Sequence, residues 1–86
     1  MVTLKELGIG YSGVVKKIAV AGALKQRLLD MGITKGTRVK VIKIAPLGDP
    51  IEIELRNYNL SVRKNDAEMI QIDEVSIIKE SESEVK

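Results

Sequence analysis

The sequence predicts a mainly β domain, a small and partly open barrel of about five short strands with one inserted α-helix and short helical turns. Several stretches alternate apolar and polar residues with the two-residue period of a strand, most clearly residues 51–55. Residues 22–31 instead place apolar side chains at a helical period. The 86 residues are enough for one domain, which we expect at 1–75, followed by a polar tail at 76–86.

The N-terminal part is expected to form a helical turn and then a strand. Thr3 with Glu6 three residues later fits a capping box. Residues 8–13 match the spacing G-x-G-x-x-G, but a helical turn precedes them and a β-rich run over 14–20 follows. A dinucleotide loop needs the opposite order, strand then helix. We interpret the glycines as a bend that enters a strand.

The inserted helix is expected to bury one face. Leu24, Leu28 and Met31 lie at i, i+4 and i+7, and Gly32 is in position to end the helix as a C′ glycine. Leu29 lies off this stripe. Together with Met31 it could rim a small patch that binds a partner, although single exposed leucines are common on protein surfaces.

The centre of the chain holds a shaped loop between two strands. Residues 37–44 alternate with a change of phase near Val41, which predicts a bulge or sharp bend. The loop is Ala45-Pro46-Leu47-Gly48-Asp49-Pro50 and contains both prolines of the chain. Proline lacks an N–H and glycine tolerates positive φ, so this run cannot continue a paired strand. The residues alone favour a stiff connection and nothing more.

The remaining elements complete the barrel. Ile51, Ile53 and Leu55 should point inward, residues 57–59 should form a turn, and 60–62 a short strand. Asn65 begins a second cap-like sequence for one helical turn, and residues 70–72 give the last strand. Short strands, an inserted helix and single turns together indicate a barrel of SH3 type.

The composition excludes several classes of function. The chain has no histidine and no cysteine, so Ser–His, Cys–His and soft-metal sites cannot form. Glu52 and Glu54 should lie roughly 6.6–6.8 Å apart on one strand face, a spacing also found in inverting glycosidases. Cross-strand pairing with Lys40 and Lys43 explains them more simply. We therefore expect no enzyme, no cofactor and no metal ligands.

A nucleic-acid-binding barrel is the alternative from another class. It would require six basic residues to gather on one side: Arg38, Lys40, Lys43, Arg56, Arg63 and Lys64. The net charge is only +2, however, and two tyrosines are the only aromatic residues. Such a composition does not favour a surface that stacks bases. No long apolar run or signal sequence is visible, so a cytoplasmic location is the default expectation.

Three segments together resemble the ferrous iron transport protein A (FeoA) family. They are residues 27–33 with Gly36, residues 45–51, and residues 60–64 leading to Asp66 and Ala67. The resemblance covers about residues 3–74. It implies an SH3-like fold and an accessory or regulatory role in bacterial ferrous iron uptake. The implied partner is the membrane Fe(II) transporter, FeoB-like, with its cytosolic GTP-binding domain.

Within that resemblance, we expect the contact surface to include Pro46, Leu47, Gly48, Asp49 and Pro50, with Leu29 and Met31 as a second part. The family is also associated with transition metals, so ferrous iron is possible, but no ligand is assigned in a chain without histidine or cysteine. Activators of GTP hydrolysis often supply an arginine. Arg27 and Arg38 are candidates by residue type only.

Overall fold

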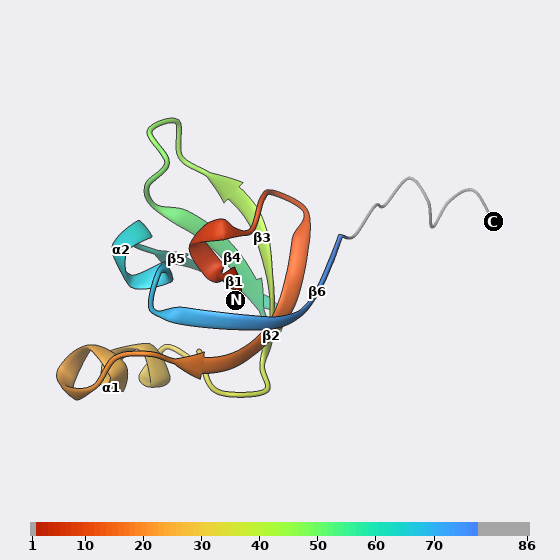
Figure 1. The fold of residues 1–86 in the computed structure, drawn as a ribbon. Helices are drawn as coiled ribbons and strands as arrows, with labels where there is room; N and C mark the ends of the chain where they lie inside the picture. Colours follow the sequence, from red (N-terminus) through yellow and green to blue (C-terminus); the bar gives the residue numbers. More distant parts are fainter. Residues whose placement is uncertain (1, 78–86) are drawn as a thin grey trace.

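The computed structural model describes residues 2–77, and in this part of the chain six strands form one antiparallel sheet (Figure 1). The strand order is β1-β6-β2-β3-β4-β5, so β1 and β5 are the edges of a curled, partly open sheet. The elements are β1 Val2–Thr3, a 3-10 turn η1 Leu4–Glu6, β2 Tyr11–Ile18, α1 Gly22–Asp30, β3 Arg38–Ile44, β4 Ile51–Leu55, β5 Tyr58–Val62, α2 Lys64–Ala67 and β6 Ile70–Ile77.

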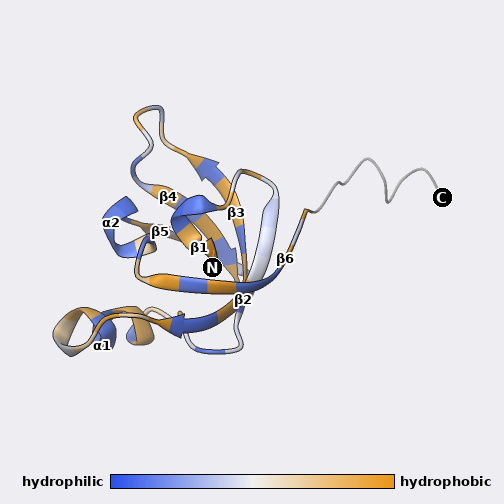
Figure 2. Cartoon of the chain, viewed as in Figure 1, coloured by the Kyte–Doolittle hydropathy of each residue, from blue (hydrophilic) through white to orange (hydrophobic). Residues whose placement is uncertain are grey.

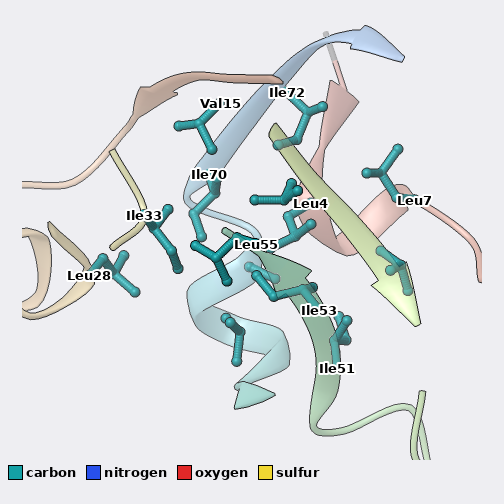
Figure 3. Packing of buried hydrophobic residues seen from close by; sticks show 14 of the residues in the cluster. Leu4, Leu7, Val15, Leu28, Ile33, Ile51, Ile53, Leu55, Ile70 and Ile72 are labelled. Atoms are coloured by element: carbon teal, nitrogen blue, oxygen red, sulfur yellow. The ribbon is translucent and has the colours of Figure 1, made fainter. Parts of the chain in front are cut away.

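A single apolar core fills the curled sheet (Figure 3). Ile51, Ile53 and Leu55 of β4 are all buried, and the residues between them alternate outward, as the sequence predicts. The same alternation appears as orange and blue bands along the strands in Figure 2. The N-terminal η1 contributes Leu4, which is fully buried. The predicted SH3-like, mainly β fold is confirmed.

Two bends let the sheet curve around this core. In β3, Val41 pairs with Ile53 and Lys43 pairs with Glu52, so one extra residue is accommodated between them. This is the bulge that the phase change predicts. In β2 the register shifts on either side of Val14, where the strand crosses β6. Gly13 is needed there, because a Cβ at this position would overlap the side chain of Ile72.

The inserted helix ends as expected. Gly32 has φ of 99°, its N–H donates to Leu29 O, and the N–H of Ile33 donates to Leu28 O, each at 3.0 Å. These two bonds make a Schellman motif. The hydroxyl of Tyr58 donates to Met31 O at 2.7 Å, which ties the end of α1 to the β4–β5 hairpin. Helix termination is thus coupled to the sheet.

Several element boundaries differ from the sequence-based prediction. β2 begins at Tyr11 and ends at Ile18, earlier than expected at both ends, because its pairing with β6 starts in the glycine-rich stretch. The two-residue strand β1 was not predicted, since two residues are too few for a periodic pattern. β6 reaches Ile77, which pairs with Tyr11. The remaining residues of the expected tail, 78–86, lie outside the described part of the chain.

The β4–β5 connection is tighter than predicted. Arg56 and Asn57 have φ of 50° and 72° and form a two-residue turn, so Tyr58 already belongs to a strand. The second helical turn starts at Lys64, which places Asn65 inside the helix and not at its cap. None of the helices within residues 2–77 is long and apolar enough to cross a membrane.

Candidate partner-binding surface

The loop between β3 and β4 presents one apolar side chain to solvent. Gly48 N–H donates to Ala45 O at 2.7 Å, and Ala45 N–H donates to Pro50 O at 3.1 Å, which closes the base of the loop. Gly48 has φ of 88°, a value that favours glycine, and the Asp49–Pro50 peptide bond is cis. Leu47 at the tip of this closed turn is 92% exposed. The loop therefore holds an apolar group outward on a well-bonded base.

Asp49 points back to the fold. Its Oδ1 accepts a hydrogen bond from the backbone N–H of Lys64 at 2.9 Å, at the start of α2. The residue that precedes this helix, Arg63, provides no side-chain cap. Asp49 thus takes the capping role from a distant part of the sequence, satisfying an N–H that the helix leaves unpaired. Of the expected contact residues, Leu47 faces solvent and Asp49 is engaged in the fold.

The expected second part of the surface is separated from this loop. Leu29 and Met31 are both half-buried and pack against the core cluster, and Met31 also receives the Tyr58 hydroxyl on its carbonyl. Figure 1 shows residues 45–50 and α1 at opposite ends of the domain. The structure does not bring these two groups together into one continuous patch.

A groove lies beside Leu29 instead. It has a volume of about 540 Å³ and is lined by Ile18 and Leu29 together with four lysines, Lys16, Lys17, Lys25 and Lys35. The groove runs between the end of β2, α1 and the turn that follows it. Sequence reasoning missed this site because its residues come from three segments that share no common period.

Three of the six basic residues considered for nucleic acid lie beside acidic residues. Lys40 lies opposite Glu54 and Lys43 opposite Glu52 in the β3–β4 register. Arg38 lies 3.7 Å from Glu74. The cross-strand arrangement that the sequence predicts for these lysines is therefore present. Alternating charge weakens the continuous positive field that phosphate binding needs.

The two arginines considered as activating residues both contact acidic side chains. Arg27 Nη2 lies 2.9 Å from Asp66 Oδ2, and the Asp66 side chain is only 16% exposed. Arg38 also donates to the Ser12 hydroxyl at 3.3 Å, besides its contact with Glu74. These contacts link α1 to α2 and β3 to β2 and β6. They give both residues a role within the fold.

Within residues 2–77 the carboxylates do not gather into a metal-binding cluster. Glu52 accepts a hydrogen bond from Asn59 at 3.1 Å, and Glu54 is exposed opposite Lys40. Across residues 2–77 no three acidic side chains come close enough to hold a metal ion. The chain also lacks the imidazole and thiolate ligands that transition metals prefer. The residues in the described part therefore do not fit a transition-metal site.

One surface ion pair lowers the pKa of a carboxyl group. Lys5 Nζ lies 2.5 Å from Glu68 Oε2, joining η1 to α2. The hydrogen bond from Lys5, together with its positive charge, holds the pKa of Glu68 below its ordinary value of 4.5. Both side chains of this ion pair are exposed, at 37% for Lys5 and 42% for Glu68.

Comparisons with known proteins agree with the SH3-like fold described above. The six-stranded, partly open antiparallel sheet of residues 2–77 defines a small SH3-like domain. A family model for the FeoA domain matches residues 2–74, and the chain belongs to this family. A FeoA protein of Chlorobium tepidum, solved by NMR, is 38% identical, with 91% of this chain and 71% of that one covered at a TM-score of 0.76.

Two further relatives extend the comparison. A Fe(2+) transport protein A/Fe(2+) transporter FeoB fusion protein of Porphyromonas gingivalis is 34% identical over 73 residues, which are 85% of this chain and 9% of that protein. The present chain thus spans about a tenth of that relative. A Stenotrophomonas maltophilia FeoA complexed with zinc, described as an SH3 domain protein, is 24% identical, with 92% of this chain and all of that one covered at a TM-score of 0.80. At that identity the likeness shows the fold.

Proposed function

We propose that this chain is a non-enzymatic, cytoplasmic accessory protein of bacterial ferrous iron uptake that docks on the cytosolic part of a membrane Fe(II) transporter. The observation that carries the proposal is the Porphyromonas gingivalis relative, in which a region similar to this chain and a FeoB transporter form one protein. Fusion of two partners raises their effective local concentration and makes a weak contact productive. A separate chain of the same family would make that contact by docking.

The loop of residues 45–50 is the proposed docking element. Exposed apolar side chains on a rigid base lose little conformational entropy on binding, which makes them effective anchors. Leu47 meets both conditions, since it is 92% exposed and the turn beneath it is hydrogen-bonded. Pro46 and Pro50 limit the backbone freedom of the same loop. Asp49 supports the loop from behind through Lys64.

Isotope-labelled protein titrated with the GTP-binding domain of the transporter, with and without nucleotide, tests the docking site. We expect amide shifts concentrated at residues 46–50, and Leu47→Ala should weaken binding without loss of fold. Asp30→Ala is a matched control, because Asp30 is an exposed residue that bonds only Gln26 within the described part of the chain. Equal binding by folded Leu47→Ala and Asp30→Ala would refute the loop as the anchor.

A further inference from the structure

The groove beside α1 combines an apolar floor with a one-sided charge. Ile18 of β2 is 7% exposed, and Leu29 of α1 is half-buried, so both offer apolar surface without projecting from the domain. Lys16 and Lys17 precede Ile18 on β2, while the other two lysines come from α1 and from the turn after it. Figure 2 shows the strongly hydrophilic end of β2 next to α1.

No ion pair within residues 2–77 includes a lysine of the groove, although Lys16 also lines a neighbouring hollow with Asp73 and Glu74. The ion pairs in this part of the chain are Lys5–Glu68, Arg27–Asp66 and Arg38–Glu74. Four charges of the same sign therefore surround one small apolar floor, although the whole chain carries only +2. The mutual repulsion of these lysines would be relieved by an acidic ligand.

The chemistry of the lining selects among acidic ligands. Bases are typically stacked on aromatic rings and phosphates are held in bidentate fashion by arginine, whereas the lining offers neither group and binds anions through lysine point charges alone. Lysine ammonium groups are mobile point charges whose long stems can cover an apolar ligand. A recessed apolar floor also suits one inserted side chain better than a flat lipid surface.

We propose that this groove binds an acidic peptide segment that inserts one large aliphatic side chain between Ile18 and Leu29, with its carboxylates facing the four lysines. This inference rests on the proposed docking function, and assigns the segment to the cytosolic part of the transporter. It gives the domain a second contact, at the end opposite the loop of residues 45–50. The loop contact is apolar, and the groove contact is mainly electrostatic.

Two double variants with the same change of net charge test the transporter contact. Lys25→Gln with Lys35→Gln removes half of the groove charge, whereas Lys40→Gln with Lys43→Gln removes two charges on β3. We expect the groove variant to bind the transporter's GTP-binding domain about fivefold more weakly at low salt. The β3 variant should bind as the wild type does, and added salt should shrink the difference.

Equal binding by the two double variants would overturn the groove assignment and leave docking intact. Failure of the wild-type chain to bind the transporter domain would instead count against the proposed function. A peptide titration then tests whether the groove binds an acidic peptide, independently of the transporter. The probe is a short synthetic peptide of glutamates around a central leucine. The control is the same peptide with serine in place of that leucine.

The leucine peptide should shift the amides of residues 16–18, 25–29 and 35, and the serine peptide should bind several-fold more weakly. Equal binding of the two peptides would exclude an inserted aliphatic side chain. Stronger lysine-dependent binding to vesicles of phosphatidylserine, or to a single-stranded RNA oligonucleotide, than to the leucine peptide would also overturn the proposal. Each of those results would identify an anionic polymer or lipid surface as the ligand.

Discussion

Replacing Asp49 with alanine should destabilise the whole domain, although this residue lies in an exposed loop. Its carboxylate accepts the N–H of Lys64 at the start of α2, 15 residues further along the chain. Alanine would leave that N–H without a side-chain partner and would free the loop from the helix. The variant is therefore expected to act on stability, unlike a change at the tip of the same loop.

The expected loss of unfolding free energy follows from the kind of hydrogen bond that Asp49 makes. Loss of a side-chain cap costs about 1 kcal/mol of unfolding free energy, and the exposed position of Asp49 argues against a larger value. Asparagine keeps an acceptor oxygen but loses the charge, so Asp49→Asn should cost about half as much. For a domain of this size, 1 kcal/mol corresponds to a decrease in Tm of about 4–8 °C.

Urea unfolding followed by circular dichroism measures the effect. With a slope of about 1 kcal/mol per molar urea, Asp49→Ala should lower the midpoint by about 1 M without changing the slope. Leu47→Ala is the matched control, because its 92% exposed side chain supports nothing in the fold and should leave the midpoint unchanged. If Asp49→Ala unfolds at the wild-type midpoint, the capping role is refuted.

Three other changes are predicted. Gly32→Ala should cost about 2 kcal/mol because φ is 99° and the new Cβ would overlap the Tyr58 hydroxyl, and the cost should be smaller in a Tyr58→Phe background; urea unfolding of the four proteins checks this. Ile53→Ala empties a fully buried position and should cost about 2–5 kcal/mol, measured by the same titration; a smaller loss would contradict the packing of the core. The pKa of Glu68 is lowered in the fold, so its contact with Lys5 stabilises above about pH 4.5 and is lost as pH falls through the lowered pKa. Unfolding measured from neutral pH to about pH 3 should therefore show a steeper loss for the wild type than for Lys5→Met, and parallel curves would contradict the contact.

Local patterns were sufficient to predict most of the fold. The alternation at Ile51, Ile53 and Leu55, the helical stripe of α1 and the phase change near Val41 each express burial of one face, which operates within a few residues. Gly32 could be assigned because a helix end has a local geometry that favours glycine. Such features can be predicted without knowing which other segment of the chain packs against them.

Features that depend on distant contacts were not predictable in the same way. The capping of α2 by Asp49 joins residues 15 apart, and Asn65 offers a more obvious but incorrect local cap. The strand β1 has only two residues and exists through its pairing with β6. The groove gathers lysines from three segments, so only the folded chain reveals it. The loop at 45–50 could be predicted from its prolines. The sequence did not show which of its side chains faces solvent.

Binding to the full-length transporter in lipid nanodiscs tests the central claim most directly. Labelled wild-type protein should bind nanodiscs that contain the transporter saturably, and should not bind empty nanodiscs of the same lipid. Leu47→Ala should bind more weakly while keeping the wild-type unfolding midpoint. Equal signals from loaded and empty nanodiscs would contradict docking on the transporter, whatever nucleotide is present.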